Sequence, residues 1–191
     1  MWNLFIFENL FSNLNIFIMQ AITSFRAVNL TITNYRTYLF ALLFVAGNIL
    51  LPQLCHLVPD GGKIWLPIYF FTLIASYKFG IKVGLLTALL SPLCNHLLFG
   101  MPPAGMLPVL LVKSSLLAIA ASWIALKSGK LSLWHISLVV LIYQIAGGMA
   151  EWGISGSLSA ALQDFRLGFP GMLLQVVGGW FVLKLLAKYE I

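Results

Sequence analysis

Charged residues are scarce in this sequence. Only 8% of the 191 residues are Asp, Glu, Lys or Arg and 61% are hydrophobic, whereas a soluble domain has about 25% charged and about 45 to 50% apolar residues. The mean hydropathy is +0.98, and a chain of this size buries only roughly 70% of its unfolded surface, so much apolar surface must face lipid. The composition therefore excludes a water-soluble globule and predicts an integral membrane protein.

The motifs of several enzyme classes are also absent. The chain contains neither a G-x-x-x-x-G-K-[ST] phosphate loop nor a G-x-G-x-x-G dinucleotide loop after a strand, so we expect neither ATP hydrolysis nor a nucleotide cofactor. No H-E-x-x-H or G-x-S-x-G motif is present, and no pair of acids lies inside a predicted span. We therefore expect that the protein is not an enzyme and has no cofactor, and that any energy source is a separate protein.

Cysteine is nearly absent as well. The two cysteines, Cys55 and Cys94, are too few for a disulfide framework. Together with the nearby His56 and His96 they would form a set of ligands suited to zinc or another soft metal if the two segments converged. The alternative is that both cysteines are small buried hydrophobes. A metal-ion transport subunit is thus one alternative function, although we assign no residue to a metal.

Regular apolar runs begin after Arg36 and predict an all-α integral membrane bundle of six transmembrane helices. The second run is short, and the segment around Pro59–Gly62 before it predicts a re-entrant or irregular first outer loop. Prolines inside the third and fourth spans, Pro92 and Pro108, predict kinks. Residues 38–191 form the predicted membrane domain, and its spans are 38–58, 64–79, 81–100, 105–126, 132–152 and 169–187.

Residues 1–37 form a predicted N-terminal cytoplasmic or interfacial segment. They do not resemble a signal peptide, because Glu8 precedes any basic residue and no small-residue cleavage site follows. An interfacial helix is the predicted structure. The alternative is that translation starts at Met19.

The distribution of Lys and Arg predicts the orientation in the cell membrane. The net charge of +6 does not indicate nucleic acid, because the cations stand singly between apolar runs. If both termini of this multi-pass protein are cytoplasmic, the outer loops hold only Lys63 and Arg166, as the positive-inside rule requires. The inner side then holds Arg26, Arg36, Lys78, Lys82, Lys127, Lys130, Lys184 and Lys188.

One cation, Lys113, belongs to no loop. It lies about two turns into the fourth span, where a charged side chain costs about 2.5 to 3.5 kcal/mol and usually faces a wet cavity or an acid. We interpret it as a ligand-binding residue. An ion pair with Glu151 and a side chain that extends to the interface are the alternatives.

Other polar and aromatic residues also gather in the outer halves of the predicted spans, whereas the inner halves are mostly apolar. This asymmetry predicts a pocket open to the exterior with a dry floor, and not a polar pathway through the bilayer. For each of these residues, helix capping, packing or interfacial anchoring is the alternative to ligand contact. The candidate ligand-binding residues, besides Lys113, are Glu151, Asn95, His96, Trp152, Gln175 and Trp65.

Gly- and Pro-containing stretches recur between residues 38 and 187. They are 57–62 (LVPDGG), 65–67 (WLP), 77–80 (YKFG), 84–86 (GLL), 89–92 (LLSP) and 98–103 (LFGMPP). Together they resemble one family, the substrate-binding S components of energy-coupling factor transporters. The small-x-x-x-small seam that the family carries on its first helix is imperfect here, because Ala41 and Ala46 are five residues apart.

The resemblance implies the substrate-capturing subunit of an ATP-driven, ABC-type vitamin importer. Such a protein has six helices, binds a vitamin or related micronutrient from outside, and associates within the lipid membrane with a transmembrane coupling subunit and two ATPase subunits. Because Lys113 is a cation, we expect a small ligand that bears a carboxylate. A stand-alone secondary transporter is the main alternative, but it would need coupling-ion residues at mid-depth and paired repeats, which the sequence does not show.

Overall fold

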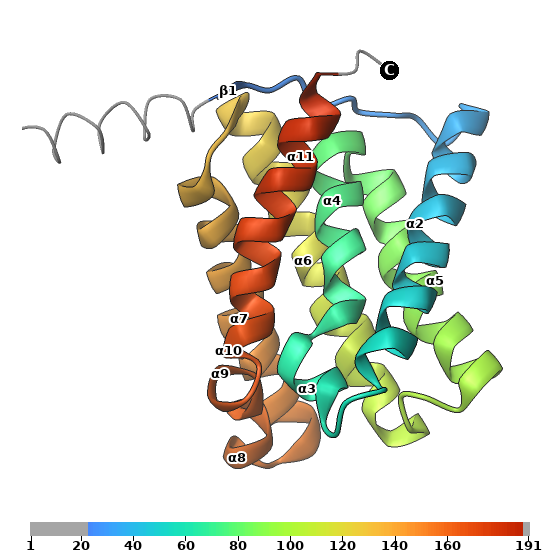
Figure 1. Cartoon of the computed structure of the whole chain (residues 1–191), viewed down its shortest axis with the longest axis vertical. Coiled ribbons are helices and arrows are strands. Elements are labelled where there is room, and N and C mark those ends of the chain that lie inside the picture. Colours follow the sequence, from blue (N-terminus) through green and yellow to red (C-terminus); the bar gives the residue numbers. More distant parts are fainter. Residues whose placement is uncertain (1–22, 189–191) are drawn as a thin grey trace, which may run out of the picture.

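The structure is a computed structural model that describes residues 23–188. The chain forms a bundle of helices that run roughly along one axis (Figure 1). We call the end that carries residues 23–34 and the C-terminus of the last helix the terminal end, and the opposite end the cavity end. Two-residue strands at the terminal end, β1 (Thr23–Ser24) and β2 (Lys130–Leu131), pair in antiparallel register.

Five helical segments of the described chain are long and apolar enough to cross a membrane. This confirms an all-α, membrane-embedded architecture, and the observed bounds agree closely with five of the six predicted spans. The predicted span 64–79 is not among the five segments. Four of the segments contain the long helices α2 (Tyr35–Cys55), α5 (Ile81–Phe99), α6 (Leu107–Ser128) and α7 (Leu133–Ser155). The segment with α6 also includes the 3₁₀ turn η2 (Ala104–Met106), which precedes that helix. The fifth segment consists of three consecutive elements, α10 (Phe169–Leu173), the π-helical turn η3 (Leu174–Gly178) and α11 (Gly179–Ala187).

The segment predicted as a short second span is broken into three pieces. They are α3 (Gly61–Trp65), the 3₁₀ turn η1 (Pro67–Tyr69) and α4 (Phe70–Phe79). At 1.5 Å per residue, α4 is about 15 Å long, roughly half of a hydrocarbon core about 30 Å thick. Every residue from Thr72 to Phe79 is buried, and α4 packs on α2, α5, α6 and α11. Protein, not lipid, therefore surrounds α4.

Residues 25–30 close the terminal end of α4. The amide of Val28 donates to the Lys78 carbonyl at 2.7 Å, and the amide of Leu30 donates to the Phe79 carbonyl at 3.3 Å. These bonds satisfy carbonyls that the end of a helix leaves without an intrahelical partner. Between β1 and α2 the chain is not helical, so the predicted interfacial helix is absent from residues 23–34; its remaining part, residues 1–22, lies outside the described residues.

The prolines act differently from one another. Pro92 lies inside α5, as predicted, and Pro52 lies inside α2. The kink predicted at Pro108 is wrong, because α6 begins at Leu107 and Pro108 stands in its first turn. Proline is favoured there, since its missing N–H would have no intrahelical partner in any case.

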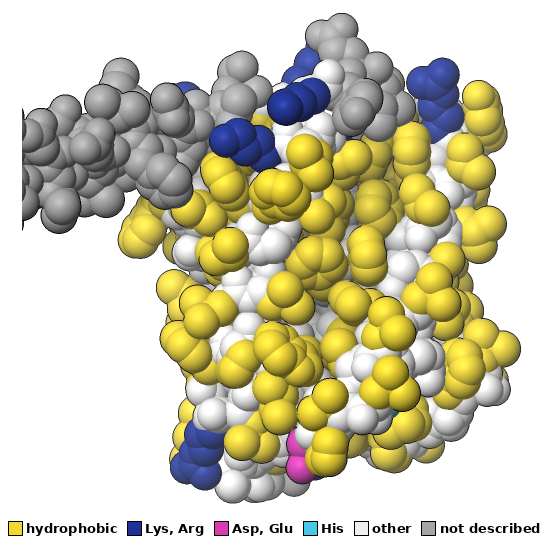
Figure 2. All heavy atoms as spheres, viewed as in Figure 1, with side chains coloured by type: hydrophobic (Ala, Val, Ile, Leu, Met, Phe, Trp, Pro, Cys, Tyr) yellow, Lys and Arg dark blue, Asp and Glu magenta, His cyan; other side chains and the backbone are white. Residues whose placement is uncertain are grey.

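The outside of the bundle is apolar along its length. Figure 2 shows hydrophobic side chains over most of the face in view, with most of the visible Lys and Arg at the terminal end. The interior of the terminal half is mostly apolar, and its fully buried side chains include Leu73, Ile74, Phe79, Leu117, Ile136 and Leu183. It also buries Lys78, in the last turn of α4, whereas the other buried lysine of the described chain, Lys113, lies toward the cavity end.

Candidate functional site

A cavity of about 540 Å³ lies at the cavity end of the bundle. Its volume falls within the roughly 300 to 1,000 Å³ typical of pockets that bind small molecules. Helices α2, α3, α5, α6, α7 and a four-residue helix, α9 (Gln163–Arg166), all contribute to its wall. Residues that are far apart in the sequence thus surround one hollow.

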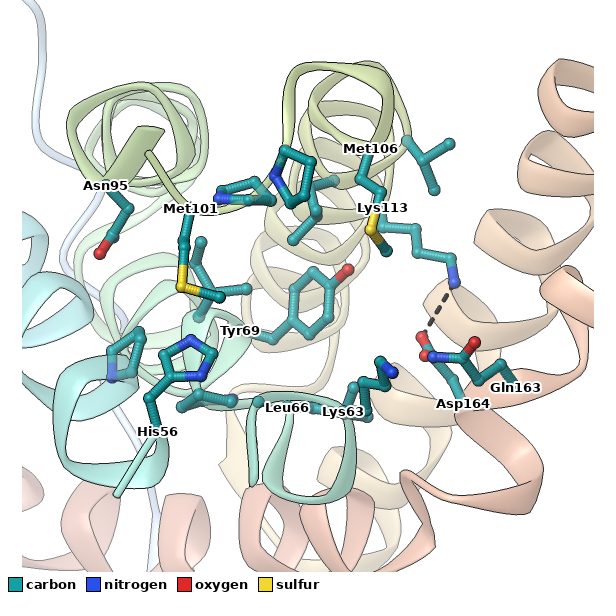
Figure 3. A pocket seen from close by; sticks show the side chains of 18 of the residues that line it. His56, Lys63, Leu66, Tyr69, Asn95, Met101, Met106, Lys113, Gln163 and Asp164 are labelled. Carbon is teal, nitrogen blue, oxygen red and sulfur yellow. Dashed lines mark hydrogen bonds and ion pairs between the residues drawn. The ribbon is translucent and has the colours of Figure 1, made fainter. Parts of the chain in front are cut away.

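Lys113 is the central charged group of this wall. Its Nζ donates to a carboxylate oxygen of Glu151 and, at 2.9 Å, to Oδ2 of Asp164. The lysine side chain is 3% exposed, and those of the two acids are each 13% exposed. This ion-paired cluster, Lys113–Glu151–Asp164, joins α6, α7 and α9; Figure 3 shows Lys113 and Asp164 meeting at one side of the cavity.

Glycines in and after α7 allow the cluster to form. A Cβ at Gly147 would lie 2.7 Å from Cγ of Lys113, so only glycine leaves room for the lysine stem against α7. Gly156 ends α7 with φ of +66°, a conformation that glycine adopts without steric cost. Ser157 then caps a second short helix, α8 (Leu158–Ala161), and the following α9 brings Asp164 back to Lys113.

A second, exposed ion pair lies at the cavity rim. Lys63 Nζ lies 2.9 Å from Oδ1 of Asp60, and their side chains are 51% and 62% exposed. Both residues line the cavity. Solvent-exposed pairs of this kind contribute about 0 to 1 kcal/mol, so this pair adds little to stability.

Asn95 forms the polar wall opposite the ion-paired cluster, and Asn48 supports it from behind. Asn48 is fully buried; its Nδ2 donates to Thr72 and Ser91 hydroxyls at 3.0 and 3.1 Å, and its Oδ1 accepts from the Phe71 amide at 3.2 Å. Asn95, which lines the cavity, donates from Nδ2 to the Asn48 and Ser91 carbonyls, each at 2.9 Å. Oδ1 of Asn95 is buried and has no hydrogen-bond partner among residues 23–188. It is therefore an acceptor that a ligand or water can satisfy.

The rest of the wall is largely apolar and aromatic. The Tyr69 ring is buried and points into the cavity between Met101 and Lys113 (Figure 3). The other apolar lining residues are Pro52, Leu66, Pro67, Ile68, Met101, Pro102, Pro103, Met106, Val109 and Leu110. A cavity with one charged side, one amide side and apolar walls suits an amphiphilic small molecule.

The structure brings three of the seven predicted site residues to this cavity, namely Lys113, Glu151 and Asn95. His96 instead lies in the last turn of α5, with its Nδ1 2.7 Å from the Pro102 carbonyl oxygen, and Trp65 and Trp152 are 39% and 52% exposed. None of these three lines the cavity.

The fourth residue outside the cavity, Gln175, is fully buried behind it. Its Oε1 accepts a hydrogen bond of 2.8 Å from the Tyr143 hydroxyl. The Tyr143 ring in turn contacts the ring of Tyr69, with 5.3 Å between centroids. Gln175 is thus connected to the cavity wall through two tyrosines and does not border the hollow.

Sequence reasoning missed Asp164. It lies between the last two spans and looks like a solvated loop acid, yet it is one of the two acids that pair with Lys113. The available signal was charge: a lysine inside a span needs a counter-charge, and few acids lie near it in the predicted topology.

The cysteine and histidine segments do not form a metal site in the described part of the chain. Within residues 23–188 no group of three or more His, Cys, Asp or Glu side chains is arranged to hold a metal ion. Both Cys55 and Cys94 are half-buried and unpaired with each other.

No protein-family model, curated protein or solved structure matches this chain. The resemblance to transporter S components therefore stays a prediction from the sequence.

Proposed function

We propose that this protein is the substrate-capturing S component of an energy-coupling factor transporter for a vitamin-like micronutrient. In this proposal both termini are cytoplasmic and the cavity opens to the cell exterior. In addition to the five long segments, α3, η1 and α4 together form one more membrane-crossing segment, which is the second along the chain. A separate coupling subunit and two ATPases supply transport and energy, because the chain has no nucleotide-binding motif of its own.

One observation carries the proposal: a cavity with a buried charged cluster lies at one end of an otherwise apolar bundle. The cavity is lined by Lys113, Glu151 and Asp164, whereas the terminal half is filled mostly with apolar side chains and buries one charged residue, Lys78. Apart from Lys113 at the cavity and Lys78 in the last turn of α4, the described helices bury no Asp, Glu, Lys or Arg, whereas a channel or proton relay would need ionisable groups at successive depths. This arrangement supports capture from one side and not self-sufficient conduction.

The charge distribution supports the orientation. Eight of the eleven Lys and Arg residues belong to segments at the terminal end. Positively charged loops are retained in the cytoplasm. The opposite end, with the cavity, then faces outward.

The predicted carboxylate on the ligand loses its main support. That prediction treated Lys113 as a cation available to the ligand, but its ammonium group already donates to Glu151 and Asp164. An ammonium group has three donors, so one N–H is left for a neutral acceptor or water.

Purification without its partners tests the proposed function. We expect a small organic molecule to be retained at about one per protein after extraction in mild detergent, and native mass spectrometry would detect it as a mass that dissociates on activation. A variant with Leu110→Trp, which fills the apolar wall of the cavity, should lose the molecule while remaining folded. The proposal would be contradicted if the purified protein retained no small molecule and bound no added micronutrient. Uptake by the isolated protein in vesicles, driven by an ion gradient, would instead favour a stand-alone secondary transporter.

A further inference from the structure

The charges that face the cavity do not balance. Three acids line it, Asp60, Glu151 and Asp164, against two lysines, Lys63 and Lys113. Asp60 and Lys63 neutralise each other at the rim. Lys113 is left with two carboxylates, so the ion-paired cluster carries one negative charge in excess when all three groups are ionised.

The excess charge is in a place where water cannot easily compensate it. The side chains of Glu151 and Asp164 are each only 13% exposed. A carboxylate withdrawn from water is costly unless a cation or hydrogen-bond donors satisfy it. The cluster therefore needs one more positive charge to be neutral, and a ligand with a negative charge would not supply it.

Acceptor atoms are available for such a cation. Each carboxylate uses one oxygen for Lys113, and neither Oε1 of Glu151 nor Oδ1 of Asp164 has a hydrogen bond to any residue from 23 to 188. Oη of Tyr69 points toward the same side of the cavity (Figure 3) and likewise has no partner among these residues. Three oxygens from residues that line the same cavity thus have no donor among residues 23–188.

The neighbouring walls indicate that the cation is organic. Tyr69, Met101, Met106 and Leu110 provide aromatic and polarisable apolar surface within the same cavity. Rings and thioethers of this kind favour the body of an organic cation, whereas a bare metal ion needs more oxygen, nitrogen or sulfur ligands than the described residues assemble.

We propose that the ligand carries a cationic nitrogen that binds between Glu151 and Asp164, with its apolar or aromatic body against Tyr69 and the two methionines. Lys113 then acts as a positioning residue that holds the two carboxylates together. This inference rests on the proposed function, since it names the substrate class of the same cavity.

Three indoles of similar shape and different charge test the inference: tryptamine (cation), tryptophol (neutral) and indole-3-acetate (anion). We expect isothermal titration of the purified full chain in detergent at pH 7 to show tryptamine binding at least about tenfold more tightly than indole-3-acetate, with tryptophol between them. The matched variant is Asp164→Asn, which leaves Lys113 and Glu151 as a balanced pair and so keeps the fold. In this variant the preference should fall below about threefold.

Several results would overturn the inference. They are equal or tighter binding of indole-3-acetate, absence of binding by all three indoles, an unchanged preference in Asp164→Asn, or displacement of tryptamine by an equal concentration of sodium chloride. Preference for the anion would leave the proposed function intact, because retention of a small molecule on purification does not depend on the sign of its charge. Failure of that retention experiment would instead count against the proposed function.

Discussion

Replacing Lys113 by methionine is expected to destabilise the protein more than any other single change at the cavity. The substitution leaves Glu151 and Asp164 next to each other, each 13% exposed, with no counter-charge. Removal of one partner from a buried ion pair costs about 3 to 5 kcal/mol. Thermal unfolding of the purified protein in detergent, followed by circular dichroism, should show a midpoint lower by on the order of 10 °C.

The chain offers a matched control and a rescue for this experiment. Lys63→Met removes the lysine of the exposed pair with Asp60 and should change the free energy of unfolding by less than about 1 kcal/mol. Adding Glu151→Gln and Asp164→Asn to Lys113→Met removes the stranded charges and should restore most of the lost stability. Equal midpoints for Lys113→Met and Lys63→Met would show that the ion-paired cluster is not buried as described.

Asn48→Leu is the second substitution with a large expected effect. Asn48 connects three helices by bonding Thr72 and Ser91 side chains and the Phe71 amide. The Phe71 amide stands in the first turn of α4 and donates to Oδ1 of Asn48 at 3.2 Å. Leucine would leave this donor and the two hydroxyls without their partner, at a cost of about 2 to 3 kcal/mol.

Asn34→Leu is the control in the same helix. Asn34 caps α2 by accepting the Arg36 amide at 3.0 Å on the surface, and loss of such a cap costs about 1 kcal/mol. The same unfolding measurement should therefore rank Asn48→Leu clearly below Asn34→Leu. The reverse order would contradict the assignment of Asn48 as the link between α2, α4 and α5.

The helices could be predicted from the sequence because lipid imposes a simple rule on them. A segment that faces hydrocarbon must be apolar over about 20 residues, and α2, α5, α6 and α7 follow that rule. The broken run from Gly61 to Phe79 does not, because α4 is enclosed by other helices and is only ten residues long. Its length is set by its neighbours, so hydropathy alone could not determine where it begins.

The candidate site could be predicted only in part. Lys113 and Glu151 stand out because charges inside spans are costly, and their predicted depths placed them at the same end of the bundle, where they line one cavity. Asp164 was missed because its position depends on the turns of α8 and α9, which bring a loop residue to a buried lysine. Trp65 and Trp152 were included on residue type, which does not say whether a side chain faces lipid, solvent or a hollow.

The sign of the ligand charge could not be predicted from the sequence either. One cation read along the sequence indicated an anionic ligand, whereas the three-dimensional cluster contains one ammonium and two carboxylates. The two indications differ because the electrostatic potential at the cavity depends on the sum of the neighbouring charges, and that sum follows from the packing of α6, α7 and α9.

An outward-facing cavity is the feature on which the proposed function depends, and cysteine labelling tests it most directly. In a background with Cys55→Ala and Cys94→Ala, single cysteines would be introduced by Lys63→Cys at the cavity rim and Lys130→Cys at the terminal end, both exposed positions. A membrane-impermeant maleimide added to intact cells should label position 63, and should label position 130 only after permeabilisation. Labelling of position 130 but not position 63 in intact cells would contradict the proposed orientation and, with it, capture of a ligand from outside.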